Sequence, residues 1–273
     1  MIRDDKVAAF RALHVPGDPL VMPNPWDCGS ARVLTALGAK ALATTSSGHA
    51  FTLGRPDMGQ VTRDEALAHA EALCSVVDVP INGDFENGFA REPDGVAATV
   101  RLAAEAGLAG VSIEDTDLPG TGAYAFDLAL ERITAAVEAA KAANIVFSAR
   151  ADGWLNRSYD GAEAVRRCAA FAEAGADVLY APLVKPDVLR EICQIGPPVN
   201  ALAVGKMAGI SRAEYAEMGV ARISVGGALS RLTHQVIVQA GTAMLDGGDF
   251  SPLTAFDPSI DVDALLGQGA SGP

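Results

Sequence analysis

The sequence predicts an α/β protein with the (β/α)8 architecture of a TIM barrel, and three observations support this prediction. Short apolar runs rich in β-forming residues alternate with Ala-rich amphipathic stretches along the chain. Eight such pairs occupy roughly 245 residues, which is the usual size of one barrel of this kind. No GxGxxG motif follows the first run, which disfavours the alternative of a doubly wound dinucleotide-binding sheet.

The expected elements follow one another in a regular order. The eight expected strands cover residues 20–23, 41–45, 79–83, 109–113, 145–149, 176–180, 197–202 and 221–225. The eight expected helices cover residues 28–37, 63–76, 93–106, 127–142, 161–174, 186–194, 212–218 and 228–245. Thr62, Asp160 and Ser211 each precede a Glu by three residues, which is the spacing of a capping box at the start of a helix.

The chain is expected to form one barrel domain over residues 1–246 and a C-terminal tail over 247–273. No linker-like change in composition occurs before the tail. Within the tail, Ile260, Val262, Leu265 and Leu266 give residues 256–266 the apolar positions of a short docking helix. The last residues, GQGASGP, are expected to be disordered.

Composition excludes several classes of function. The chain has 21 Lys and Arg against 34 Asp and Glu, a formal net charge of −13, which disfavours binding to nucleic acid or to an anionic membrane surface. No apolar run is long enough for a membrane helix. The four cysteines lie far apart and form no CxxC or zinc-binding spacing, which is typical of a reducing compartment. We therefore expect a cytoplasmic protein.

Charged residues follow three neighbouring strands of the expected barrel. Asp84 and Glu86 come after the third strand, Glu114 after the fourth and Arg150 after the fifth. Barrel active sites lie at these strand ends, and carboxylates crowded there repel one another unless a cation lies between them. Oxygen ligands without clustered His or Cys favour Mg²⁺ or Mn²⁺, and Arg150 suits a substrate carboxylate or phosphonate. The alternative is a set of ion pairs with a structural role only.

Ser46, Ser47 and Gly48 form a run of small residues after the second strand. Their backbone N–H groups are placed to hold an anionic oxygen, although an ordinary strand-to-helix turn has the same composition. His49 is interpreted as a loop residue bonded to backbone. Cys28 is expected to pack beneath Trp26 as a small apolar side chain, and a reactive thiol at the start of a helix is the less favoured alternative.

Six segments in order resemble one enzyme family. They read NPWDCGSARVL, TTSSGHAFTLGRPD, VPINGDFENGFA, GVSIED, FSAR and RISVGGAL, and they span about residues 20–245. Together they are similar to the isocitrate lyase/phosphoenolpyruvate mutase superfamily, most of all to its short bacterial branch of phosphonomutase-like and carboxy-lyase-like proteins. The resemblance implies a TIM barrel enzyme that acts on a small carboxylate.

The resemblance also implies roles for individual residues. DFENGFA resembles the family's DxDTGYG metal motif, which makes Asp84 and Glu86 metal ligands, and Glu114 matches the glutamate of its LED segment. The implied ion is Mg²⁺. Arg150 matches the arginine that binds the substrate carboxylate.

Further residues match the family's substrate-binding loop. Ser47 and Gly48 match the loop whose amides hold that carboxylate, and Asp57 in LGRPD matches an active-site aspartate. The implied catalytic residues are Asp57, Arg150 and Glu114, and the implied substrate ligands are Ser47, Gly48 and Arg150.

The sequence departs from the family in the segment that follows Glu114. The lyases carry a catalytic cysteine there in a KKCGH loop, whereas this chain reads TDLPGTGAYAF without Cys, His or Lys. The mutases carry a Lys and an Asn in the same segment after Glu114, and these are missing from TDLPGTGAYAF as well. The lyase glutamate expected after the seventh strand is also absent, since that region reads NALAVGK. Cleavage of isocitrate or methylisocitrate is therefore not expected. We expect the Gly-rich segment from Asp115 to Tyr124 to act as a lid.

The expected activity is that of a Mg²⁺-dependent lyase acting on a small α-oxo or α-hydroxy (di)carboxylate through a pyruvate enolate. Decarboxylation of an oxaloacetate-like acid is the leading hypothesis, because it needs no dedicated base. The alternatives are C–C cleavage of a 2-hydroxy diacid, P–C bond chemistry on phosphonopyruvate, and a non-catalytic barrel that binds a small acid. By resemblance the protein is expected to be a homotetramer.

Overall fold

The computed structural model describes residues 2–271 and confirms the (β/α)8 barrel. The strands are β1 (Leu20–Met22), β2 (Leu42–Ala43), β3 (Ile81–Asp84), β4 (Gly110–Glu114), β5 (Val146–Arg150), β6 (Val178–Tyr180), β7 (Val199–Leu202) and β8 (Arg222–Ser224). They form one parallel sheet in the order β1-β8-β7-β6-β5-β4-β3-β2. The Ala43 amide donates to the Pro23 carbonyl at 3.1 Å and joins β2 to the end of β1, which closes the ring.

The eight expected helices all form. They are α2 (Cys28–Ala36), α4 (Arg63–Val76), α5 (Pro93–Glu105), α6 (Phe126–Ala142), α7 (Gly161–Ala174), α8 (Pro186–Cys193), α9 (Arg212–Glu217) and α10 (Ala228–Gly247). The predicted capping boxes at Thr62 and Ser211 both form. In each, the N-cap side chain accepts from the backbone amide of the Glu three residues later, and that Glu side chain accepts from the N-cap amide. Asp160 caps its helix by accepting from the Glu163 amide, while the Glu163 side chain pairs with Arg166 and Arg167 instead.

Several short elements escaped sequence reasoning. They are α1 (Arg3–Ala12), α3 (Ser46–Thr52) and the 3-10 turns η1 (Asp152–Trp154), η2 (Gly205–Gly209) and η3 (Ser251–Ala255). The charged residues at the start of α1 make its apolar pattern hard to recognise in the sequence. Its apolar face consists of Val7 and Phe10, both fully buried. Phe10 packs so close to Gly110 on β4 that a Cβ there would lie 2.5 Å from its ring. The helix α1 therefore closes the bottom of the barrel.

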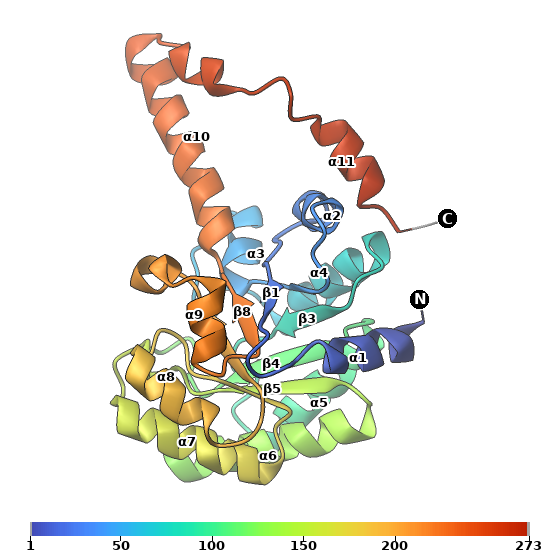
Figure 1. Ribbon diagram of the computed structural model, residues 1–273, viewed down its shortest axis with the longest axis vertical. Helices are drawn as coiled ribbons and strands as arrows, with labels where there is room; N and C mark the ends of the chain where they lie inside the picture. Colours follow the sequence, from blue (N-terminus) through green and yellow to red (C-terminus); the bar gives the residue numbers. More distant parts are fainter. Residues whose placement is uncertain (1, 272–273) are drawn as a thin grey trace.

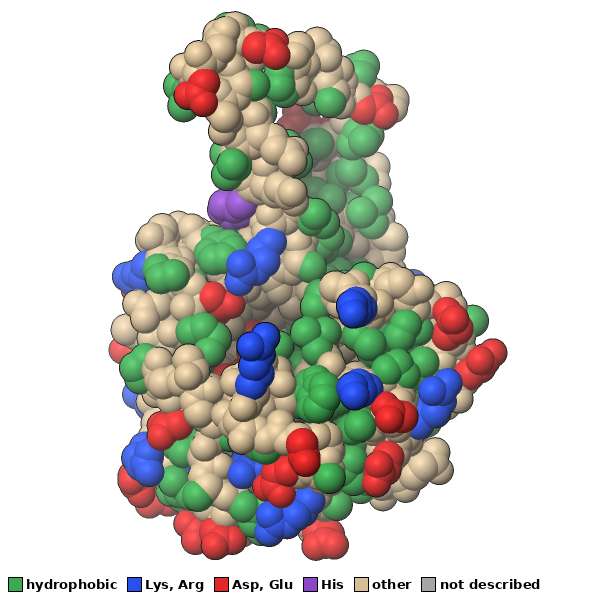
Figure 2. Space-filling view, turned by 90° about the vertical axis from the view of Figure 1, so that its left-hand side faces the viewer, with side chains coloured by type: hydrophobic (Ala, Val, Ile, Leu, Met, Phe, Trp, Pro, Cys, Tyr) green, Lys and Arg blue, Asp and Glu red, His purple; other side chains and the backbone are tan. Residues whose placement is uncertain are grey.

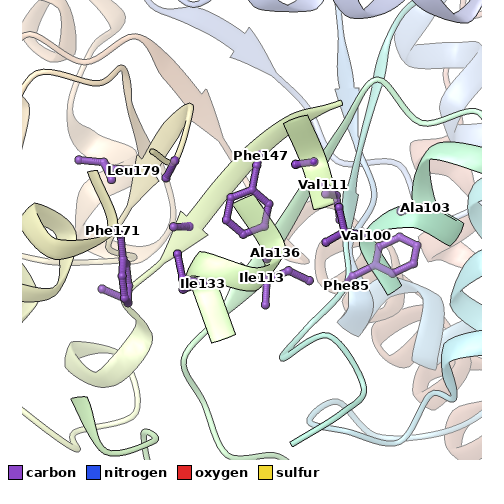
Figure 3. Packing of buried hydrophobic residues seen from close by; sticks show 14 of the residues in the cluster. Phe85, Val100, Ala103, Val111, Ile113, Ile133, Ala136, Phe147, Phe171 and Leu179 are labelled. Carbon is purple, nitrogen blue, oxygen red and sulfur yellow. The ribbon is translucent and has the colours of Figure 1, made fainter. Parts of the chain in front are cut away.

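The hydrophobic core lies between the strands and the surrounding helices, and Figure 3 shows the part between β4–β6 and α5–α7. Successive side chains of a strand alternate between its two faces. On β4, Val111 and Ile113 point outward into this core, whereas Ser112 and Glu114 line the cavities at the barrel's centre and mouth. The same alternation places the charged residues of the neighbouring strands inside the barrel mouth.

The last helix of the barrel, α10, projects away from the strands (Figure 1). Figure 1 shows α10 standing away from the barrel and the tail returning from its far end toward α2. Leu232, Val236 and Ile237 on α10 are exposed, and so is Val21 on β1, at 49%. Figure 2 shows that hydrophobic side chains line this projecting arm. The helix expected over residues 228–245 forms, but these apolar side chains do not cover the barrel of their own chain. Helical periodicity predicts the helix and does not reveal which surface it covers.

The C-terminal tail carries the expected helix. It forms over Val262–Gln268 and lies against α2 of the same chain. Residues 267–271 of the segment expected to be disordered are described, and 272–273 lie outside the described residues. No helix within residues 2–271 is both long and apolar enough to cross a membrane.

We predict that Phe10→Ala lowers the free energy of unfolding by about 3–5 kcal/mol, because it empties the packed space under the barrel. Urea denaturation followed by circular dichroism measures this. Phe256→Ala is the matched control, since Phe256 is 72% exposed, and it should change stability by less than about 0.5 kcal/mol. Equal effects of the two substitutions would contradict the role assigned to α1.

Candidate active site

Arg150 lies at the centre of a cluster of carboxylates at the C-terminal end of the barrel. Its Nη1 is 2.7 Å from Asp84 Oδ1 on β3, and its Nη2 is 3.0 Å from Glu114 Oε2 on β4. Glu114 and Arg150 are also register partners on neighbouring strands. The structure thus brings together three of the four charged residues that the strand ends predicted.

A third carboxylate in this cluster was not assigned a role from the sequence. Asp152 binds Arg150 through both oxygens, at 3.2 Å from Nε and 2.7 Å from Nη2. The Tyr180 ring on β6 lies 5.1 Å from the guanidinium carbon. Burial opposes the charge of Arg150, but the nearby carboxylates hold its pKa above the ordinary value. The position of Asp152 two residues after Arg150 was the only signal for it.

Asp84 is fixed by the start of α3. Its Oδ2 accepts from both the backbone amide and the hydroxyl of Ser46, each at 2.9 Å. The backbone amide of Asp84 donates to Thr44 Oγ1 at 2.7 Å. The run of small residues that was interpreted as a loop is therefore the first turn of a helix, and its N-terminal amide already binds a carboxylate of the protein.

Ser47 and Gly48 differ in their access to the site. Ser47 lines an inner cavity that extends into the barrel, and its Oγ is 3.3 Å from Thr45 Oγ1. The Gly48 amide instead donates to Thr45 Oγ1 at 3.4 Å, as part of the helix cap. A Cβ at Gly48 would approach Trp26 and Thr45 within 2.7 Å, so close packing explains this glycine.

Glu86 and Asp57 lie beside the cluster. Glu86 has a left-handed backbone, with φ of 45°, and its Oε1 accepts from the Gly59 amide at 3.2 Å. Burial, and next the charge of Asp84, raise the pKa of Glu86 to about 7. Asp57 pairs with Arg231 of α10 at 3.2 Å, and burial raises its pKa as well.

Two cavities meet at this cluster. An inner cavity of about 270 Å³ extends into the barrel, and an outer one of about 450 Å³ lies beneath the loops that follow β4 and β5. Ser46, Asp57 and Arg150 line both. A small acid that enters the mouth would therefore meet Arg150 directly.

Comparison with known proteins agrees with this geometry. The family model for phosphoenolpyruvate phosphomutase matches residues 10–245. This chain belongs to the isocitrate lyase/phosphoenolpyruvate mutase superfamily. The match covers the whole barrel and most of α10.

Individual members of the superfamily are similar over most of the chain. A solved structure from Burkholderia cenocepacia J2315, described only as a lyase/mutase, has 41% identity and a TM-score of 0.90, covering 96% of this chain and 95% of that one. An uncharacterized protein of Mycobacterium tuberculosis is 35% identical, with 88% of this chain and 90% of that protein covered. The 2,3-dimethylmalate lyase of Eubacterium barkeri is 29% identical, with 73% and 70% covered.

This superfamily member folds the segment after Glu114 into a hairpin. Thr116 and Ala123 form an antiparallel bridge, and the Asp117 amide donates to the Gly122 carbonyl at 2.7 Å. The Asp115 carboxylate pairs with Arg167 at 2.9 Å and accepts from the backbone amide of Asp152 at 2.8 Å. Thr116, Leu118 and Thr121 of the hairpin line the outer cavity, so the segment covers the site.

The donor set of this superfamily member fits a hard divalent cation. Asp84, Glu86, Glu114, Asp57 and Asp152 surround the cavities, and Arg150 and Arg231 are the cations in contact with four of them. Burial raises the pKa of Glu114 well above its usual value and that of Asp152 to about 6, which shows that their charge is not fully compensated. Among residues 2–271, no three acidic, His or Cys side chains converge as metal ligands in the structure as it stands. Binding an ion would therefore require Glu114 or Asp84 to loosen from Arg150.

We predict that Glu86→Gln stabilises the fold at high pH. A carboxyl group whose pKa is raised by folding contributes stability below its ordinary pKa, near 4.5, and loses it as the pH rises through about 7. Gln mimics the protonated form. In EDTA, wild type and variant should be equally stable near pH 4.5, and the variant should be more stable by up to about 3 kcal/mol at pH 8.

Denaturation at a series of pH values measures this difference. Glu138→Gln, on the exposed face of α6, is the control for the loss of one surface carboxylate and should change stability by less than about 0.5 kcal/mol. A constant difference for Glu86→Gln would show that burial does not perturb this carboxyl group.

Proposed function

We propose that this protein is a Mg²⁺-dependent carbon–carbon lyase that acts on a small α-oxo or α-hydroxy dicarboxylate. The observation that carries this proposal is the Arg150 cluster at the junction of two cavities: one guanidinium contacts three carboxylates, of which Glu114 and Asp152 are buried and Asp84 is partly buried. If these residues formed ion pairs with a structural role only, the cluster would need no more acidic side chains than basic ones. The surplus of acids supports a site that is completed by a cation and an anionic substrate.

In this proposal Asp84, Glu86 and Glu114 hold the ion, with Mn²⁺ as an alternative to Mg²⁺. When bound, the ion acts as a Lewis acid that favours negative charge on the substrate's α-oxygen. Arg150 binds a substrate carboxylate once its pairs with Asp84 and Glu114 loosen, and Ser47 lies beside it on the cavity wall. Asp57, whose pKa burial raises, lies where the cavities meet and is placed to move a proton.

Two reactions of this kind fit the site. Decarboxylation of an oxaloacetate-like acid requires no acid on the hairpin, which offers Thr116 and Thr121 but no thiol or amine. Cleavage of a 2-hydroxy diacid is supported by the likeness to a 2,3-dimethylmalate lyase. P–C bond chemistry on phosphonopyruvate is the second candidate, and the match to the phosphomutase family model favours it.

A substrate screen for pyruvate release tests the proposal. The screen covers oxaloacetate and substituted malates, each with Mg²⁺ and with EDTA. Phosphonopyruvate is included under the same two conditions and followed by ³¹P NMR, because its isomerisation to phosphoenolpyruvate releases no pyruvate. We expect at least one of the diacids to be turned over with Mg²⁺ only, and Asp84→Asn to lose at least about 100-fold in kcat/KM.

Asp64→Asn is the matched control, because the Asp64 side chain is 90% exposed, and it should keep wild-type activity. Full turnover in EDTA would contradict the metal requirement. Turnover of phosphonopyruvate alone would replace the carbon–carbon reaction by the second candidate.

We also propose that the protein assembles as a homotetramer. The exposed apolar residues of α10 and the uncovered Val21 on β1 support this, because a monomer would leave both surfaces in water. Light scattering should give the mass of four chains, and Val236→Glu with Ile237→Glu should shift it toward smaller species. A monomeric wild type would contradict the proposal, and a tetramer that survives deletion of residues 247–273 would show that the tail is not needed for it.

A further inference from the structure

Three arginines line the inner cavity, and one of them, Arg222, has no acidic partner among residues 2–271. Arg222 on β8 is 2% exposed, and its three hydrogen-bond partners are all neutral. Nε donates to Asn200 Oδ1 at 3.0 Å, Nη2 donates to Ser148 Oγ at 3.2 Å, and Nη1 lies 3.2 Å from His14 Nε2. A guanidinium has five N–H groups, so two of those on Arg222 have no acceptor within the described part of the chain.

His14 does not supply the missing negative charge. Its Nδ1 lies 2.8 Å from the Phe10 carbonyl oxygen and must donate to it, which leaves Nε2 to accept from Arg222. Burial, and next the charge of Arg222, lower the pKa of His14 to about 3, so the ring is neutral. Burial also lowers the pKa of Arg222, to about 10, which is what an uncompensated buried cation shows.

Another buried arginine of the barrel is satisfied differently. Arg132 on α6 is 1% exposed and donates to the backbone carbonyls of Asn87, Ala90 and Arg91. Burial lowers the pKa of Arg132 as well, but Tyr124 and the carboxylates of Asp117 and Asp115 oppose that shift. Within residues 2–271 no carboxylate opposes the shift of Arg222, since the group that does so is the phenol of Tyr180, which is neutral at ordinary pH. Arg222 therefore differs from a structural buried arginine.

The position of Arg222 connects it with the candidate active site. The strand register makes Arg150 level with Tyr180, Tyr180 level with Asn200, and Asn200 level with Arg222, so these residues form one row across β5–β8. All four line the inner cavity, together with Ser47 and Ser224. His14 and Ser148 are not part of that lining. They contact the Arg222 guanidinium without lining the cavity.

We propose that Arg222, with Asn200 and Ser224, forms a subsite at the floor of the inner cavity that binds the second carboxylate of a diacid. This inference rests on the proposed function in taking the ligand to be the substrate. An arginine that holds a carboxylate stabilises it as an anion and opposes its loss as CO₂. The subsite therefore selects diacids whose second carboxylate survives the reaction, and it favours C–C cleavage over decarboxylation of the group held there.

The sharpest test supplies the missing counter-ion from within the protein. Asn200→Asp keeps the number of non-hydrogen atoms in the side chain. It places a carboxylate where the Asn200 oxygen already accepts from Arg222. The probes are succinate and propionate, which differ in one carboxylate, titrated calorimetrically with Mg²⁺ and again with EDTA. We expect the wild type to bind succinate at least about tenfold more tightly than propionate, and the variant to reduce this ratio to below about threefold.

Two further variants keep the test decisive. Ser148→Ala removes a hydrogen bond from Arg222 without altering the cavity wall, and it should keep the wild-type ratio. Arg222→Lys retains the charge but loses the planar fork, so its ratio of succinate to propionate affinity should lie between those of the wild type and Asn200→Asp. This variant replaces Asn200→Asp as the test if Asn200→Asp does not fold. A wild type without preference for succinate, or a preference unchanged in both Asn200→Asp and Arg222→Lys, would overturn the subsite.

Failure of this inference can be told apart from failure of the proposed function. If the wild type releases pyruvate but its succinate preference does not depend on Asn200 or Arg222, the subsite is wrong and the function stands. If the preference depends on these residues but no diacid is turned over, the subsite stands and the lyase activity is wrong. A preference that disappears in EDTA would assign the second carboxylate to the metal and would also overturn the subsite.

Discussion

The contact of Arg150 with three carboxylates from adjoining strands organises this end of the barrel. Each partner depends on a different part of the fold: Asp84 on the first turn of α3, Glu114 on its register with Arg150, and Asp152 on the turn that follows β5. The barrel brings these elements together because parallel strands end at the same rim. Substituting any one of these residues would alter the charge balance of the others.

The charge balance is what connects the fold with chemistry. Acids outnumber bases at the mouth, and burial holds several of them partly in their neutral forms. Deeper in the barrel the imbalance is reversed, because Arg222 has no acidic partner. A metal ion at the mouth and an anionic substrate group at the floor would satisfy both. A lyase acting on a diacid is the simplest occupant with that distribution of charge.

Periodicity and strand-end position predicted most of the barrel and the core of its site. Each expected strand and helix formed, and Asp84, Glu114 and Arg150 meet because the last residue of each of these parallel strands lies at the rim. Other features depend on tertiary contacts that a linear pattern does not contain. Arg222 begins an ordinary apolar strand, and only the structure shows that its neighbours are neutral. The outward course of α10 depends on surfaces that its own sequence does not specify.

A calorimetric titration of the wild-type protein with Mg²⁺ at pH 8, repeated in the presence of oxalate, tests the central claim most directly. Oxalate resembles the planar enolate of an α-oxo acid and offers two oxygens to the ion. We predict saturable binding of one ion per chain, at least tenfold tighter with oxalate than without it, as expected when ion and acid share one site. The absence of saturable binding under both conditions would contradict the account and leave the Arg150 cluster as a structural ion-pair network.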